Sequence, residues 1–282
     1  MRSPITYRQT GGVNHIYLAS YKDWLAGQPV TPNTARAYHS RIKQFLRFLE
    51  YTSLGDKPLN DAADMNVAMR LYLDFLKQSQ RGDGTVNAMI NALKSFSQFL
   101  GIETPELKRR RCYPKSTRML TLSEQQRFLR VVEQQDFARD KALALVLFYS
   151  GLRIGECARL NMENIGAGAA CISLGAGVRI PLNQETMLAV REWLEERRHL
   201  SNAEVESGLW LTKQGRRLKL ASITSIIERI AWQAKLVVSA ETLRRTWLAK
   251  AVDCHNQDEL ASKFGGYVSR ATLKRYGASL SI

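Results

Sequence analysis

The sequence contains few cysteines and no long apolar run. Its four cysteines, Cys112, Cys157, Cys171 and Cys254, show no C-x-x-C spacing, so neither a zinc site nor a disulfide framework is indicated. No stretch approaches the roughly 18 apolar residues of a membrane span, and the N-terminal "MRSPITYRQTGG" lacks an apolar signal region. We therefore predict a cytoplasmic protein with ordinary buried or half-buried thiols, no metal or other cofactor, and no membrane partner.

Acidic residues are also scarce. The chain has 26 Asp and Glu against 41 Lys and Arg, which gives a net charge of +15 over 282 residues. Residues 105–120 hold six basic residues and one acidic residue, a third of the excess. This charge predicts a polyanionic partner, and double-stranded DNA is favoured because no basic amphipathic helix suggests anionic lipid. A solvated basic surface without a partner is the alternative.

The first hundred residues have the apolar spacing of four helices, over 15–27, 31–52, 65–80 and 84–100. Thr31 followed by Pro32 is a typical helix start. We predict a compact helical DNA-binding domain over 1–104. The polar faces of its second and fourth helices suit a DNA groove, and the predicted contacts there are Arg36, Lys43, Arg47, Asn87, Asn91 and Lys94.

A basic linker over 105–120 follows, with further predicted DNA contacts at Lys108, Arg109, Arg110 and Arg111. A second domain over 121–282 opens at "TLSE", where Thr121 and Glu124 form a capping box. Its pattern predicts helices up to Tyr149 and a small hairpin. The later elements expected are helices over 185–200, 223–236, 241–252, 258–264 and 270–276 and a short strand over 209–212.

The stretch "YSGLRIGE" places a cation where an apolar helix stops. Gly151 can end that helix in the left-handed conformation, and Arg153 follows directly. Arg153 either points to water as a simple surface residue or delivers a fixed charge to a ligand. Arg244 likewise has a plain alternative, an ion pair with Glu241 at i, i+3.

A helical domain and a basic linker are followed by three motifs, in the order "SGLRIGE", "ETLRRTW" and "FGGYVSRATLKRY". This arrangement resembles the tyrosine recombinases of the lambda-integrase family. The resemblance covers nearly the whole chain. It implies a mainly α fold with a small β-hairpin, in which a four-helix SAM-like core-binding domain precedes a mostly helical catalytic domain. It assigns catalytic roles to Arg153, Arg244 and Tyr276, with Glu156 as the acidic residue of the first motif.

The residue types suit phosphodiester chemistry. Two guanidiniums can grip the non-bridging oxygens of a phosphate bidentately where negative charge grows during attack. A tyrosine hydroxyl, with a pKa of about 10, becomes a usable nucleophile beside arginines as it loses its proton. By resemblance, the resulting 3′-phosphotyrosine conserves the bond energy, so strands rejoin without ATP or metal.

The chain departs from the family at three positions. Ala176 occupies the hairpin tip where the family has a lysine general acid, and the nearby Arg179 is a poor proton donor. Glu241 stands at the usual histidine position, where its charge would repel a phosphate. Tyr267 stands where relatives have histidine or tryptophan, and it could still donate a hydrogen bond.

Two functions remain open at this point. The first is a site-specific recombinase that cleaves and rejoins DNA, assembling as a tetramer on its target by resemblance. The second is a catalytically silent, accessory DNA-binding protein that works with an active recombinase or another accessory protein. The retained nucleophile and arginines favour the first, and the replaced lysine and histidine favour the second.

Overall fold

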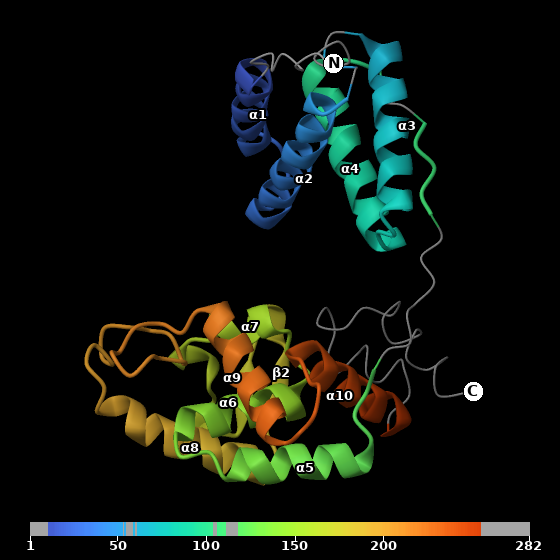
Figure 1. The fold of residues 1–282 in the computed structure, drawn as a ribbon. Helices are drawn as coiled ribbons and strands as arrows, with labels where there is room; N and C mark the ends of the chain where they lie inside the picture. Colours follow the sequence, from blue (N-terminus) through green and yellow to red (C-terminus); the bar gives the residue numbers. More distant parts are fainter. Residues whose placement is uncertain are drawn as a thin grey trace, which may run out of the picture. The chain divides into compact units, whose positions relative to one another are not determined.

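The computed structural model describes residues 11–52, 54, 59, 61–103, 106–110 and 118–254, which form two compact units divided between Pro114 and Lys115. The mainly α fold class predicted from the sequence is confirmed, since helices dominate both units and one small sheet lies in the second (Figure 1). None of the described helices combines the length and apolar composition needed to cross a membrane.

The N-terminal unit contains four helices: α1 (Gly11–Ala26), α2 (Pro32–Glu50), α3 (Ala62–Gln78) and α4 (Asp83–Leu100). Helix α2 starts as its sequence predicts, because the Thr31 hydroxyl accepts the Thr34 N–H at 3.2 Å. Apolar side chains from all four helices, among them Tyr21, Phe45, Met69 and Phe96, are fully buried in one core. Helices α1 and α3 each pack against α2 and α4, and they lie on opposite sides of that pair (Figure 1).

The C-terminal unit is organised around a buried helix. Its elements are α5 (Leu122–Glu133), α6 (Ala138–Ser150), α7 (Ile154–Arg159), β1 (Cys171–Ser173), β2 (Arg179–Pro181), α8 (Gln184–Arg198), α9 (Leu220–Gln233) and α10 (Ala240–Cys254). Helix α6 is buried around most of its circumference and packs against α5, α8 and α10. Such a helix is a rigid support for whatever is attached to its end.

The start of this unit matches the predicted capping box. The Thr121 hydroxyl accepts the Glu124 N–H at 3.3 Å, and the Glu124 carboxylate accepts the Thr121 N–H at 3.0 Å. The backbone hydrogen bond from Thr121 lowers the pKa of Glu124, with the neighbouring Arg118 adding to the effect. Just before this cap, the Leu120 N–H is donated to the Thr246 hydroxyl on α10 at 2.9 Å. The chain entry is thereby attached to α10.

Two local expectations had different outcomes. The hairpin is present, because β1 and β2 pair antiparallel with Ile172 opposite Ile180. The strand predicted over 209–212 is wrong, since Leu211 forms only an isolated bridge with Arg217. Leu209, Trp210 and Leu211 are apolar because they are buried in the core. The helices expected over 258–264 and 270–276 lie outside the described residues.

Candidate active site

The end of α6 forms the base of the candidate site. Gly151 closes the helix with a φ of +63°, which is the left-handed conformation that glycine adopts without steric cost. Its Cα packs on the Trp247 indole of α10 so closely that an added Cβ would lie 2.2 Å from a ring carbon. Two independent constraints, the backbone conformation and this contact, therefore require glycine here.

Arg153 lies two residues beyond this glycine, at the N-cap of α7. Its guanidinium Nη1 is 2.9 Å from Glu156 Oε1, and its backbone N–H donates to Glu156 Oε2 at 2.7 Å. One carboxylate thus fixes both the backbone and the side chain of Arg153. The Arg153 side chain nevertheless remains 52% exposed, so it can still meet a ligand.

Arg244 reaches the same turn from α10. It is 3% exposed, and its Nη1 donates a hydrogen bond to the Gly151 carbonyl oxygen. The turn at Gly151 therefore joins three parts of the unit: the C-terminal end of α6, the residue before α7 and the buried arginine of α10. Two positions separated by 91 residues in sequence, Arg153 and Arg244, are held by the same three-residue turn.

Glu241 has a different partner from the one its sequence position offered. Its Oε1 lies 3.1 Å from Nε of Arg245, at i, i+4, instead of pairing with Arg244 at i, i+3. Arg244 is turned into the core while Arg245 is half-buried at the surface, so only Arg245 is placed for the pair. The carboxylate at the family's histidine position is therefore partly neutralised along its own helix.

The hairpin tip is short. Residues Gly175–Gly177 form one turn of 3-10 helix between β1 and β2, so Ala176 is at the tip as predicted. Arg179 pairs with Ser173 on the returning strand and is exposed. The two predicted catalytic tyrosines, Tyr267 and Tyr276, lie outside the described residues.

The predicted DNA contacts of the N-terminal unit divide into two groups. On α2, Arg36, Lys43 and Arg47 are exposed, as a nucleic-acid contact requires. On α4, Lys94 is half-buried and lines a hollow with Asn91.

The asparagines of α4 have partners within the chain, which sequence reasoning missed. The Asn87 amide donates to the Arg110 carbonyl oxygen and accepts the Arg110 N–H, both at 2.9 Å. Asn91 Oδ1 accepts from the Arg109 guanidinium at 2.6 Å. These residues therefore hold the first part of the basic segment on α4. The spacing of Asn87 and Asn91, one helical turn apart, was the available signal.

The basic segment itself presents an exposed Lys108 and Arg109. Arg110 is half-buried, and its Nη1 lies 3.6 Å from Asp83 Oδ1. Arg111 lies outside the described residues. Lys108 and Arg109 are thus the members of this group that the described structure leaves accessible to a polyanion.

The sequence matches two family models. Residues 118–281 match the phage integrase family, and residues 18–103 match the phage integrase N-terminal SAM-like domain. Among curated relatives, the chain is 24% identical over 249 residues to TnP I resolvase of Bacillus thuringiensis, covering 83% of this chain and 84% of the relative. It is 23% identical over 281 residues to tyrosine recombinase XerC of Lacticaseibacillus casei, covering 92% of each.

Solved structures show the same fold. The Tn1549 transposon integrase in complex with circular intermediate DNA has a TM-score of 0.69 at 16% identity, covering 92% of this chain and 94% of that one. A lambda integrase dimer bound to a core site has a TM-score of 0.63 at 16% identity, covering 93% and 94%. Together with the matched family models, these similarities confirm the resemblance read from the motifs: the chain belongs to the phage integrase family, the tyrosine recombinases.

Proposed function

We propose that this chain is a site-specific DNA recombinase that cleaves and rejoins strands through a 3′-phosphotyrosine intermediate. Arg153 and Arg244 bind the scissile phosphate, Glu156 orients Arg153, and Tyr276 is the nucleophile. Tyr267 donates a hydrogen bond to the same phosphate. The observation that carries the proposal is the shared turn at Gly151, which holds Arg153 two residues away and accepts a hydrogen bond from Arg244.

The chemistry of such a site needs no external energy. The Tyr276 hydroxyl loses its proton as its oxygen attacks phosphorus, and the bond to the 5′-oxygen breaks as that oxygen takes up a proton. The resulting 5′-hydroxyl later reverses the step on the same or another strand. Two fixed guanidiniums stabilise the extra negative charge on the phosphate oxygens during both attacks. The proton donor for the leaving 5′-oxygen is not the usual lysine, because Ala176 occupies that position.

A second candidate function has its own support. Ala176 at the hairpin tip and the Glu241–Arg245 ion pair replace two groups that assist proton transfer and phosphate binding in the family. A chain of this kind could bind DNA as an accessory protein beside an active recombinase. Trapping of a covalent adduct distinguishes the two functions, because only the recombinase forms one.

The DNA partner follows from charge and from the relatives. We assign duplex contacts to the exposed cations of α2 and to Lys94 on α4, and to the basic segment that begins at Lys108. The Tn1549 integrase structure contains DNA, and a lambda integrase tetramer has been solved on a Holliday junction. We infer that this chain also self-associates on its DNA target.

Replacing Arg153 by lysine tests the phosphate-binding role. Lysine keeps the charge but loses the planar fork, so adduct formation should fall by about 100-fold to 1000-fold while DNA affinity changes less than about twofold. The measurement uses nicked duplexes whose sequence has first been selected from a random library by binding to the protein.

The control for this variant is Arg159→Lys, which changes an exposed arginine in the last turn of the same helix and should leave adduct formation unchanged. An equal loss of binding and adduct in Arg153→Lys would show that Arg153 contributes general affinity and not transition-state stabilisation. Absence of any adduct from the wild-type protein on its selected duplex would favour the accessory function.

The basic segment can be tested by its salt dependence. Each phosphate contact contributes about 0.9 to the slope of log affinity against log salt. Replacing Lys108, Arg109 and Arg111 by alanine should therefore lower the slope by about two to three. A control variant removes two exposed cations elsewhere, Arg191 and Arg198 on α8, and should leave the slope nearly unchanged. An unaltered slope in the first variant would remove the segment from the interface.

A further inference from the structure

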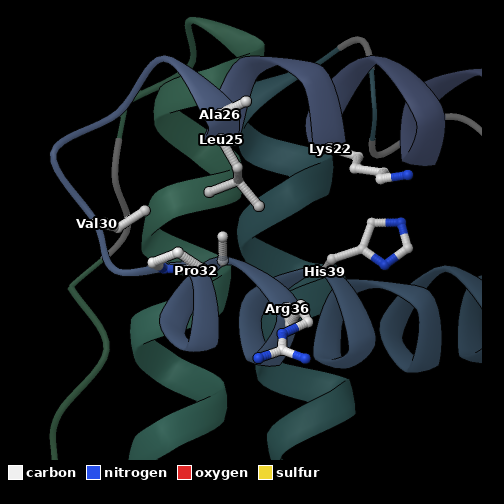
Figure 2. Close-up of a pocket in the computed structure, with 8 residues that line it drawn as sticks. Lys22, Leu25, Ala26, Val30, Pro32, Arg36 and His39 are labelled. Atoms are coloured by element: carbon white, nitrogen blue, oxygen red, sulfur yellow. The ribbon is translucent and has the colours of Figure 1, made fainter. Parts of the chain in front are cut away.

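A cavity opens in the N-terminal unit between the end of α1 and the start of α2 (Figure 2). It has a volume of about 440 Å³, which is within the range of binding pockets. Its floor is apolar and is formed by Leu25, Ala26, Val30, Pro32 and Ala35. A side chain with apolar atoms would displace water from this floor and so gain free energy on entering.

The rim of the cavity is cationic. Lys22 from α1 and His39 from α2 lie beside one another, and Arg36 also lines the cavity, with its guanidinium pointing away from these two side chains (Figure 2). None of the described residues that line the cavity carries a carboxylate. Burial lowers the pKa of His39, and the nearby Lys22 and Lys43 lower it further. An anionic group on an occupant would relieve this concentration of positive charge, so the cavity suits an apolar side chain with an acidic neighbour.

Helix α3 presents an apolar stripe that matches this description. Val67, Leu71 and Phe75 follow one another at intervals of four residues and are 49%, 47% and 48% exposed. Large apolar side chains aligned in this way on a helix surface usually mark a protein interface. Within the unit, Phe75 is supported from behind by the rings of Phe48 and Tyr72, with centroids 5.4 Å and 6.2 Å away.

Acidic side chains bracket the stripe. Asp64 and Asp74 are exposed and flank it at the helical spacing that places them beside Val67 and Leu71. Of the exposed cations of α3, Arg70 follows Val67 at i+3 and precedes Asp74 at i+4, so it borders the Val67 end of the stripe, whereas Lys77 lies farther around the helix. The stripe therefore offers leucine and phenylalanine together with an adjacent aspartate. This combination complements the apolar floor and basic rim of the cavity.

The two surfaces lie on opposite sides of the N-terminal unit, because α1 and α3 flank the α2–α4 pair (Figure 1). We propose that the α3 stripe of one copy docks into the α1–α2 cavity of the next copy, with Leu71 and Phe75 on the apolar floor and Asp74 beside Lys22 and His39. Such a head-to-tail contact uses two different surfaces and can close into a ring. The proposal rests on the self-association inferred above and identifies its contact.

The contact is too small to hold copies together without DNA. The stripe runs over nine residues from Val67 to Phe75, a length of about 12 Å, whereas stable interfaces bury more than about 1,000 Å². When two copies bind one duplex, their high effective concentration compensates for the weak contact. The contact therefore appears as cooperative binding to DNA.

The test is a set of substitutions in the full chain, measured by sedimentation on a duplex that carries two adjacent copies of the selected sequence and on one that carries a single copy. Leu71→Asp and Lys22→Glu should each lower the affinity for the second protomer by about tenfold or more and leave single-copy binding within about twofold. The double variant Lys22→Glu with Asp74→Lys should regain most of the cooperativity, because the ion pair is restored in reverse. Val205→Asp, at another exposed apolar residue, is the control.

The outcomes separate this contact from the proposed function. Unchanged cooperativity in Leu71→Asp, a wild-type protein that binds the two sites independently, or a double variant no better than Lys22→Glu would overturn the contact while leaving recombination intact. A loss of single-copy affinity in Lys22→Glu would overturn it too, and would assign the cavity to DNA. Failure of the wild-type protein to bind any duplex would instead refute the proposed function.

Discussion

Replacing Tyr276 by phenylalanine is expected to abolish the covalent protein–DNA adduct. The substitution removes one oxygen, the atom that attacks phosphorus, so adduct formation should fall by a factor on the order of 10³ or more. Affinity for the duplex should change by less than about twofold, because the ring and all cations remain. The adduct is measured on a nicked selected duplex, where the released short strand leaves and the intermediate accumulates.

A matched control is Tyr149→Phe. Tyr149 donates a hydrogen bond to Glu185 Oε2 at 3.1 Å, and burial and this carboxylate raise its pKa to about 12. Such a hydroxyl is a poor nucleophile, so removing it should leave the adduct yield unchanged. Full adduct formation by Tyr276→Phe would exclude this residue as the nucleophile. An absent adduct in both variants would indicate that the assay reports folding and not chemistry.

Local sequence signals predicted much of the fold because they concern neighbouring residues. The Thr31 cap, the Thr121–Glu124 capping box and the Gly151 stop each follow from side chains that interact with backbone groups within a few positions. The position of Arg153 directly after a buried helix was readable for the same reason. The apolar stretch over 209–212 led to the wrong prediction of a strand, since a short buried segment has the same composition whether it is a strand or irregular.

Contacts between residues far apart in the chain could not be predicted from the sequence. Asn87 was interpreted as a DNA contact because a polar residue on a helix face has no visible partner in one dimension, yet its amide binds the backbone of Arg110. The hydrogen bond from Arg244 to the Gly151 carbonyl and the exposed stripe of α3 likewise depend on how helices pack. A helical period separates an apolar face from a polar one, but it does not reveal which apolar residues remain uncovered.

Gly151→Ala should damage stability and chemistry together, because this glycine is where the two arginines meet. The left-handed backbone costs a Cβ about 1–2 kcal/mol, and the forced contact with Trp247 adds about 1–3 kcal/mol. We expect the C-terminal unit to lose about 2–5 kcal/mol of its free energy of unfolding, measured by urea denaturation. Gly101→Ala is the matched control, since Gly101 has a φ of +68° and nothing within 4 Å of its added Cβ, so it should lose only the backbone part.

A compensating substitution separates the packing effect from the backbone effect. The double variant Gly151→Ala with Trp247→Leu lacks the ring that the new Cβ would contact. Its loss of free energy of unfolding should therefore be smaller than the sum of the losses in the two single variants. If the shared turn positions Arg153 and Arg244, adduct formation by Gly151→Ala should fall by more than the unfolded fraction explains, measured well below its melting temperature. Additive stability losses would argue against the contact with Trp247, and adduct formation that tracks only the folded fraction would argue that the turn supports the fold without setting the geometry of the arginines.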